Sequence, residues 1–511
     1  MGDPPTSGAT IIFPGQFLPR PSAAALCSGM GIAVVAARVA EVAEAAVLRA
    51  RWPSAQYVEL PDCLVMPGLV NAHQHGRGLS QVQLGYHDDF LETWIASRRG
   101  RSVLDAYAVT RLAAARMLAQ GVTCTVHANY SYGSGDYESE LRAQLRAYDE
   151  VGIRIAMCVG AMDQGAVVYP PPEACFMAGL PRKLREWLSR PGARLYAGDA
   201  ASTICLMDRL LAEFCGHPRI RLCYGPAGPQ WVSDAMWSAL ARDAARKGLG
   251  LHLHALESPA QRAAATELFP EGVFARLEKL GAMTSRTVIA HGVWVEDADL
   301  EIMARTGATV VRNPGCNIRM RNGIAPMARY LEHGVRLAIG TDNASMADDE
   351  DLLAELRLAG NLAREPRWNA PSSPSAGQLL AMLTVNGSVA AQFAPEVGIL
   401  EPGHRADLVA ISLKRTCSPY LDPDMPLIEA VLARARGSDV RLTMVDGRIL
   451  YRDGELPGLD MDEIERAAAA AACRARRPTE GASRERTAQL DGQLRRHYAG
   501  ITAPGPRDHS G

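Results

Sequence analysis

The sequence predicts an α/β protein whose larger part is a barrel of eight parallel strands. Short apolar runs recur along the middle of the chain and alternate with amphipathic stretches of helical character, such as residues 105–119 and 233–247. Near-continuous apolar strands separated by helices are typical of parallel strands buried on both faces. We therefore expect a (β/α)8, TIM-like barrel over residues 67–395, with strands at 67–75, 121–129, 153–160, 220–226, 249–255, 286–292, 308–315 and 335–343.

Both chain ends carry a second, strand-rich pattern. The first 66 residues contain short strand-like pieces separated by Pro and Gly, and a similar pattern returns in residues 396–458, where Asp446-Gly447 is a turn signal. Neither end makes a closed core alone. We expect residues 1–66 and 396–458 to build one small β-sandwich domain around the central barrel.

Two further segments fall outside this scheme. Residues 160–219 form a longer connection than one crossover needs, so we expect an elaborated loop over the barrel mouth. Residues 459–511 are rich in Ala, Arg and Glu before a Pro- and Gly-containing end. This composition predicts that residues 459–511 form a C-terminal helical extension that finishes in a loose tail.

The composition limits the classes of partner. A net charge of −2 and a pI near 6.6 provide no basic field for nucleic acid, so a small-molecule partner is favoured. The 11 cysteines are scattered without a CxxC pair, which indicates reduced thiols in a cytoplasmic protein. No apolar run approaches the roughly 18 residues of a membrane span, and the first residues lack the features of a secretory signal.

Four histidines and an aspartate stand where predicted strands end. His73 and His75 lie one residue apart in VMPGLVNAHQHGRG, so a strand directs both imidazoles to one face. His254, His291 and Asp342 end three later strands. Each alone has an ordinary explanation, as a buried core histidine or a turn aspartate. Because the carboxyl ends of barrel strands meet at one mouth, the five together indicate a metal site.

The donor types restrict the metal and suggest its chemistry. Three imidazoles with one carboxylate suit Zn²⁺ or Fe²⁺ better than Mg²⁺ or Ca²⁺, which prefer oxygen ligands. Such a metal would lower the pKa of a bound water toward about 7 and supply hydroxide at neutral pH. Glu257 follows His254 by three residues, where its carboxylate could shuttle a proton. His252, one layer deeper, is expected to support a ligand rather than to be one.

Together these motifs resemble those of the amidohydrolase superfamily. The most similar branch contains cytosine and guanine deaminases, S-adenosylhomocysteine deaminase and the s-triazine hydrolases. The resemblance rests on HQH after PGLVNA, the H-x-x-E of residues 254–257, IAHG, GTDN and the closing EPGHRADLV, and it covers roughly residues 55–455.

The resemblance implies a role for each residue at the strand ends. Glu257 would be the proton shuttle, and His291 would donate a hydrogen bond to the metal-bound water or the tetrahedral centre. Asp342 would also be the base that deprotonates the water. The metal ligands would be His73, His75, His254 and Asp342.

The resemblance also bears on the number of metals. Many members of the superfamily hold two metals bridged by a carboxylated lysine at the end of strand 4. Here the only lysines between residues 151 and 250 are Lys183 and Lys247, and neither is near that strand. A single divalent metal is therefore implied, Zn²⁺ first and Fe²⁺ second.

Two features concern the substrate. S-adenosylhomocysteine-type deaminases resemble one another in a Pro-His after strand 4, whereas here Pro226 precedes Ala227, which argues against an ordinary adenosine-type substrate. The FLETW segment keeps the Glu-x-Trp pattern of the pocket wall in that branch. Trp94 could equally be an ordinary buried aromatic residue. The candidate substrate contacts are Glu92, Trp94, Gln230, Trp231, His127 and Asn317.

The pattern favours a metal-dependent aminohydrolase. Metal-bound hydroxide would add to an sp² carbon of a nitrogen heterocycle of the purine, pterin, pyrimidine or s-triazine type, and ammonia would leave. The same site could instead release chloride or an alkylamine, or open a cyclic amide or urea, because the tetrahedral step is shared. A non-catalytic relative would show eroded ligands, whereas every expected position is filled. The resemblance further implies a homodimer or a larger homo-oligomer.

Overall fold

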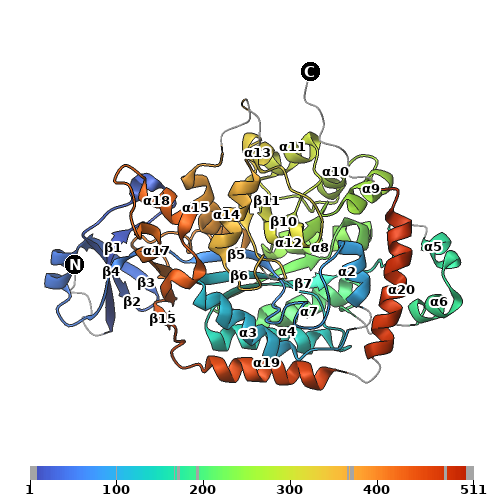
Figure 1. Cartoon of the computed structure of the whole chain (residues 1–511), viewed down its shortest axis with the longest axis horizontal. Helices are drawn as coiled ribbons and strands as arrows, with labels where there is room; N and C mark the ends of the chain where they lie inside the picture. Colours follow the sequence, from blue (N-terminus) through green and yellow to red (C-terminus); the bar gives the residue numbers. More distant parts are fainter. Residues whose placement is uncertain are drawn as a thin grey trace.

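The computed structural model describes residues 8–98, 101–165, 167–169, 173–190, 195–343, 345–364, 368, 373–476 and 480–501. Its centre is a sheet of eight parallel strands that follow one another in chain order, and each coincides with one of the predicted apolar runs, β7 extending one residue past its run. The predicted barrel is confirmed (Figure 1). The strands are β5 (Leu69–Gln74), β6 (Val122–Ala128), β7 (Arg154–Ala161), β8 (Ile220–Pro226), β9 (Leu251–Ala255), β10 (Thr287–His291), β11 (Thr309–Arg312) and β12 (Arg336–Ile339).

The barrel closes where its first and last strands meet. Gln74 pairs with Asp342 in a parallel bridge beyond the end of β12. The backbone N–H of Asp342 donates to the carbonyl of His73 at 3.0 Å, and the N–H of His75 donates to the carbonyl of Asp342 at 3.2 Å. The closure therefore fixes three of the predicted metal ligands relative to one another.

Helices surround the barrel, and their ends follow local sequence signals. Asp105, Asp136, Ser233 and Ser258 are N-caps whose side chains accept a backbone N–H of the first turn. The helices from the first strand of the barrel to its last helix are α2 (Leu91–Ser97), α3 (Ala106–Ala119), α4 (Tyr137–Val151), α5 (Glu173–Gly179), α6 (Arg182–Leu188), α7 (Ala200–Glu213), α8 (Asp234–Lys247), α9 (Pro259–Leu268), α10 (Val273–Lys279), α11 (Asp297–Thr306), α12 (Pro314–Arg319), α13 (Met327–Glu332), α14 (Leu352–Leu362), α15 (Ala376–Leu383) and α16 (Val385–Ala390).

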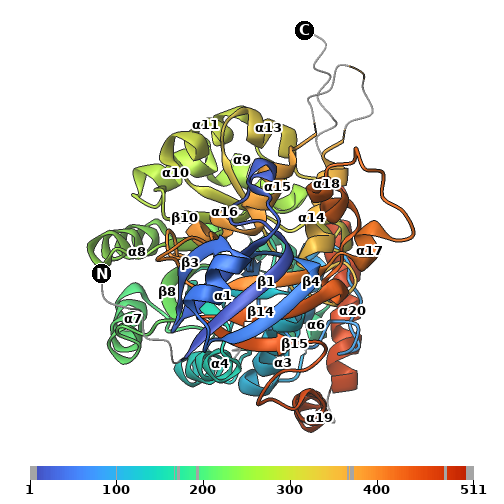
Figure 2. The same cartoon turned by 90° about the vertical axis from the view of Figure 1, so that its left-hand side faces the viewer.

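The two chain ends build a separate seven-stranded sheet in the order β15-β14-β13-β4-β1-β2-β3 (Figure 2). The strands form one continuous sheet rather than the two sheets of a sandwich, because β4 pairs with both β1 and β13. A shared core joins residues from both halves of this sheet, including Ile12, Val34, Leu408 and Met444. The bounds are β1 (Ala9–Phe17), β2 (Met30–Val35), β3 (Arg38–Glu44), α1 (Ala45–Arg51), β4 (Gln56–Pro67), β13 (Leu408–Ser412), α17 (Lys414–Cys417), α18 (Leu427–Arg434), β14 (Val440–Val445) and β15 (Arg448–Arg452).

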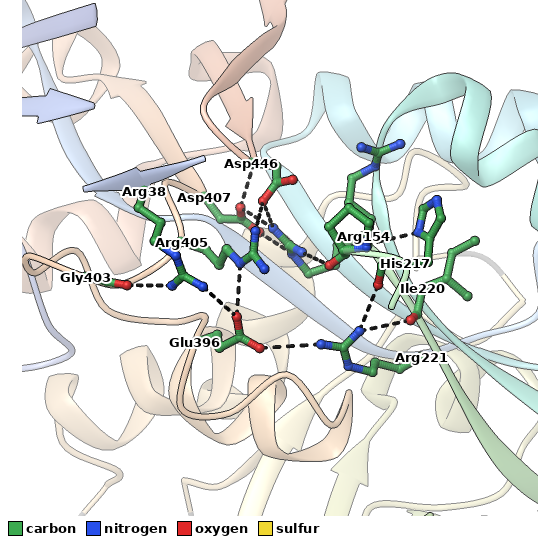
Figure 3. A network of polar contacts seen from close by, with 12 residues as sticks. Arg38, Arg154, His217, Ile220, Arg221, Glu396, Gly403, Arg405, Asp407 and Asp446 are labelled. Carbon is green, nitrogen blue, oxygen red and sulfur yellow. Dashed lines mark hydrogen bonds and ion pairs between the residues drawn. The ribbon is translucent and has the colours of Figure 1, made fainter. Parts of the chain in front are cut away.

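A buried ion pair connects this sheet to the barrel (Figure 3). Arg154, at the start of β7, donates from Nε and Nη2 to the two carboxylate oxygens of Asp407, each at 2.8 Å. Its Nη1 donates to the carbonyl of Pro218 at 2.7 Å, and Asp446 Oδ1 lies 3.1 Å from Nη2. The side chains of Arg154 and Asp407 are fully buried. Pairing satisfies two charges that would be costly to bury separately.

The C-terminal region returns to the barrel mouth. It forms α19 (Met461–Ala475), which contacts α3, and α20 (Glu480–Tyr498), which contacts α2 and α6 (Figure 1). Within the described residues, none of the helices has both the length and the hydropathy needed to cross a bilayer. The loose tail expected at the chain end falls on residues 502–511, outside the described residues.

Candidate metal centre and active site

A cavity of about 1150 Å³ opens at the carboxyl ends of the barrel strands. Strand ends contribute His75, His254, His291 and Asp342 to its lining. The segment between β7 and β8, expected as a loop over the mouth, contains α5, α6 and α7 and also lines the cavity. The C-terminal helices complete the wall with Ala472, Cys473, Ser483, Arg484 and Arg486.

Four buried imidazoles share one arrangement at the base of this cavity: each has its Nδ1 engaged by a partner. Such a contact fixes the ring orientation and leaves Nε2 as the nitrogen that faces the centre. The partners are the carbonyl of Ala128 for His75 (2.5 Å), the carbonyl of Ala227 for His254 (3.2 Å), Asn317 Oδ1 for His291 (3.0 Å) and His252 Nε2 for His73 (2.8 Å).

Three of these Nε2 atoms converge on Asp342. Its Oδ1 lies 3.1 Å from His75 Nε2, and its Oδ2 lies 3.3 Å from His291 Nε2 and 3.8 Å from His73 Nε2. Ligand atoms of His73, His254 and His291 also lie within 4.8 Å of one another. The Nε2 atoms of His73 and His254 are buried and have no hydrogen-bond partner among the described residues. Buried lone pairs without partners fit a bound metal.

The backbone at two of these positions is strained. His291 has φ 74° and Asp342 has φ 60°, in the left-handed region that residues other than glycine rarely adopt. Such conformations cost about 1–3 kcal/mol and persist where the surrounding structure holds them. For Asp342 the hydrogen bonds to β5 provide that support. The strain turns both side chains toward the centre of the barrel mouth.

Burial favours the neutral form of three of these imidazoles, those of His73, His254 and His291. It holds the pKa values of His73 and His254 well below their usual range, and it also lowers the pKa of His291. Burial acts to raise the pKa of Asp342, but its hydrogen bond with His75 and the nearby imidazoles outweigh this effect and lower it. Neutral imidazoles and an ionised carboxylate are the forms that bind a divalent metal.

Glu257 lies beside this cluster in a different state. Its carboxyl is buried, lies 3.6 Å from His291 Nε2, and accepts a hydrogen bond from Asn322 Nδ2 at 2.8 Å. Burial, then the charge of Asp342, then that of Glu92, raises the pKa of Glu257 well above its usual value. A protonated carboxyl at neutral pH can donate a proton to a bound molecule.

A sequence profile of the Amidohydrolase family matches residues 64–450. The chain belongs to the amidohydrolase family. It is 28% identical to a 5′-deoxyadenosine deaminase of Methanosarcina barkeri over 413 aligned residues, and this alignment covers 80% of this chain and 85% of the relative. The structure is similar to a zinc-bound adenosine deaminase from Xanthomonas campestris (TM-score 0.77, 24% identity, 92% of this chain and 99% of that one). It is also similar to a zinc-bound atrazine chlorohydrolase from Arthrobacter aurescens (TM-score 0.74, 21% identity, 91% and 100%).

Two of the predicted substrate contacts of this amidohydrolase line the cavity. Trp94 lies in α2, and Trp231 lies in a short 3-10 helix that follows β8. Trp231 also makes an edge contact with Tyr169, with ring centroids 6.0 Å apart. Both indole rings are therefore positioned to form walls around a bound molecule.

The other four predicted contacts lie away from the cavity lining. The Glu92 carboxylate accepts hydrogen bonds from Tyr169 and Ser258. His127 contacts the Tyr148 hydroxyl at 3.1 Å. Asn317 holds His291, and Gln230 lines a separate space of about 10 Å³. Glu92 lies in α2 and His127 lies within β6, and the hydrogen bonds of Glu92, His127 and Asn317 hold these side chains to other residues of the protein.

Several residues that line or support the site were not expected from the sequence. Tyr130, two residues past β6, stacks near His75 and His254, and its hydroxyl lies 3.4 Å from His254 Nδ1. Its place just beyond a strand end was the available signal. Asn322, which holds Glu257, lies in no motif. Other unexpected lining residues are Cys316 and three arginines, Arg77, Arg98 and Arg101.

Proposed function

We propose that this amidohydrolase is a metal-dependent aminohydrolase that replaces an amino group on a nitrogen heterocycle with oxygen and releases ammonia. The observation that carries the proposal is the pairing of two features in one cavity. Imidazole Nε2 atoms converge on the ionised carboxylate of Asp342, and the protonated carboxyl of Glu257 lies 3.6 Å from His291. Deamination is also the reaction named for the Methanosarcina barkeri relative.

The residues present fit one divalent metal. His73, His75, His254 and Asp342 would hold it, since two of their Nε2 atoms are buried without partners and the donor set suits Zn²⁺ first and Fe²⁺ second. A metal bound there supplies Lewis-acid activation of the attacking water. The contact between His252 and His73 Nδ1 orients the His73 ring toward the shared centre.

Three side chains handle protons in the proposed reaction. Asp342 accepts a proton from the water that attacks the ring carbon. Glu257 gives its proton to the ring nitrogen, takes up the second water proton from the added hydroxyl, and passes it to the departing amine, so that the C–N bond breaks with loss of neutral ammonia. The first water proton, held on Asp342, then restores the protonated form of Glu257. His291, held by Asn317, faces both carboxylates and stabilises the oxygen of the tetrahedral centre.

The aromatic walls support a planar substrate. Trp94 and Trp231 line the cavity, and stacking of heterocycles on aromatic rings is favourable. Glu92 supports the site indirectly, because its carboxylate fixes Ser258, the residue that follows Glu257 and caps α9. Its proximity also helps to keep Glu257 protonated.

An ammonia-release screen tests the proposal. Zinc-loaded protein is incubated with amino-substituted purines, pterins, pyrimidines and s-triazines, and released ammonia, chloride and alkylamine are measured separately. We expect ammonia from at least one ring class and a loss of about 10²- to 10⁴-fold in Glu257→Gln. The matched control is Glu267→Gln, which changes an exposed glutamate of α9 and should leave the rate unchanged. Chloride or alkylamine without ammonia would contradict deamination.

A further inference from the structure

The cavity is strongly cationic, although the chain as a whole carries a net charge of −2. Among the lining residues that the structure describes there are two carboxylates, Glu257 and Asp342. Both belong to the proposed metal and proton-transfer machinery, so they are not available to balance charge elsewhere. Against them stand seven arginines: Arg77, Arg98, Arg101, Arg190, Arg476, Arg484 and Arg486.

Three of these arginines surround a single aromatic ring. The guanidinium carbons of Arg77, Arg98 and Arg101 lie 5.4, 5.7 and 5.1 Å from the centroid of Trp94. Cation–π contacts hold each guanidinium near the ring, but they do not cancel the repulsion among three like charges. The Trp94 ring nitrogen is buried and has no hydrogen-bond partner among the described residues. Four sets of N–H donors therefore gather at one part of the cavity wall.

Among the described residues, these three guanidiniums have no carboxylate as an ion-pair partner. No carboxylate of a described residue forms an ion pair with Arg77, Arg98 or Arg101, and Arg77 and Arg98 have no side-chain hydrogen bond to any described residue. Arg101 is anchored by Gln81 and by Ser97 at 2.5 Å. Burial, then the charges of Arg77 and Arg98, lowers the pKa of Arg101 to about 8. The two neighbouring guanidinium charges thus add to the effect of burial.

We propose that Arg77 and Arg98, with Arg101 beside them, bind an anionic group of the substrate, a carboxylate or a phosphate. This inference rests on the proposed function, because it adds a charged substituent to the heterocycle that is deaminated. Guanidinium groups bind carboxylate and phosphate through two parallel hydrogen bonds, which gives both affinity and orientation.

The position of Arg98 relates this anion site to the reacting centre. Its guanidinium carbon lies 4.7 Å from the centroid of Tyr130, and the Tyr130 ring lies 4.8 Å from that of His75 and 5.5 Å from that of His254. One aromatic ring thus separates the guanidinium from the proposed metal ligands. A molecule whose amino group meets the metal centre would extend past Tyr130 and place its far end among the arginines.

The cavity is large enough for such a substrate. Its volume of about 1150 Å³ exceeds the range of about 300–1,000 Å³ that is common for small-molecule pockets. A bare heterocycle would leave the arginine-lined part empty. A substituent that ends in an oxyanion would fill that part and supply the missing negative charge.

Binding to a protein that does not turn over tests the anion site separately from the reaction. Zinc-loaded Glu257→Gln protein is titrated by calorimetry with adenosine, adenosine-5′-carboxylate and adenosine 5′-monophosphate, and with pterin and pterin-6-carboxylate. We expect at least one anionic compound to bind about 10-fold or more tightly than its neutral parent. The carboxylate and phosphate arms distinguish the two oxyanions.

Arginine variants in the same background assign the preference to its residues. Arg77→Gln and Arg98→Gln should each reduce it about 10- to 100-fold, while the affinity for the neutral parent stays within about twofold. Arg98→Lys keeps the charge without the paired donors, so its preference for the anionic compound should lie between that of the unmodified residue and that of Arg98→Gln. An intermediate preference would also show that the loss in Arg98→Gln is not a loss of folding. Arg182→Gln removes an exposed charge on α6 and is the matched control with no effect.

The outcomes separate this inference from the proposed function. An arginine-dependent preference for an anion, with no ammonia released from any compound by the native protein, would support the anion site and contradict deamination. Ammonia release with equal binding of neutral and anionic compounds would overturn the anion site and leave deamination in place. A preference that survives both Arg77→Gln and Arg98→Gln, or no binding of any anionic compound, would also overturn it.

Discussion

Asn322 offers a sharp test of how Glu257 is positioned. Its Nδ2 donates to Glu257 Oε1 at 2.8 Å, and both side chains are buried. The backbone carbonyl of Asn322 separately accepts from Trp294 Nε1 at 2.7 Å, a contact that a change of the side chain leaves in place. Replacing Asn322 therefore removes the orienting hydrogen bond with little disturbance of the surrounding loop.

The expected loss follows from that one contact. A hydrogen bond to an ionisable group contributes about 1.5–3 kcal/mol, which corresponds to a fall in kcat of roughly 10- to 150-fold for Asn322→Ala. Asn322→Asp should be slower still, because a carboxylate cannot donate and adds a like charge beside Glu257. KM and metal content should stay near the values of the unmodified protein, since Asn322 contacts no proposed ligand.

Steady-state ammonia release, metal analysis and thermal unfolding of each variant provide the assay. The matched control is Asn361→Ala, an exposed asparagine of α14. A kcat for Asn322→Ala within about twofold of the unmodified enzyme, or an Asn322→Asp variant more active than Asn322→Ala, would refute the positioning role. A loss of metal together with activity would place Asn322 in the support of the metal site instead.

Three further predictions concern stability. Asp407→Asn leaves Asp446 as the remaining carboxylate contact of the buried Arg154 guanidinium among the described residues, and should lower the free energy of unfolding by about 3 kcal/mol. Arg154→Met with Asp407→Leu should recover most of that loss, and a loss under about 1 kcal/mol for the single variant would contradict this. Burial raises the pKa of Glu350 from 4.5 to about 7. As the pH rises, the unfolded chain therefore releases this proton first, and the free energy of unfolding should fall between about pH 4.5 and pH 7. Glu350→Gln should flatten that part of the pH profile in chemical denaturation, and an unchanged slope would refute the assignment. The Leu490 and Leu494 side chains are fully buried against α2 and α6, so the double variant Leu490→Ala with Leu494→Ala should loosen α20. We expect faster amide hydrogen exchange in α20, and unchanged exchange would contradict this packing.

The barrel could be predicted because its signal is local and repeated. Each strand is buried on both faces, so its apolar run is nearly continuous, and the side chain that ends it must lie at the mouth. The convergence of His73, His75, His254, His291 and Asp342 follows from that rule. The small domain was predicted less fully, because alternation indicates strands but does not reveal that β4 joins all seven into one sheet.

The cavity wall was harder to predict for a physical reason. Beyond a strand end the backbone leaves its regular period, so the direction of a side chain depends on the turn that follows and on its hydrogen-bond partners. Glu92, Asn317 and Gln230 occupy the expected neighbourhood but do not line the cavity. Arg77 and Arg98 come together only through the fold, around a ring that was itself predicted as a wall residue.

A zinc titration of metal-free protein, with ammonia release as the readout, tests the central claim most directly. If His73, His75, His254 and Asp342 hold one catalytic metal, activity should rise linearly to about one equivalent of Zn²⁺ per chain and then stay constant. The same titration of Asp342→Ala should give no activity at any ratio. Ammonia release that is complete without metal, or that continues to rise to two equivalents, would contradict a single-metal aminohydrolase.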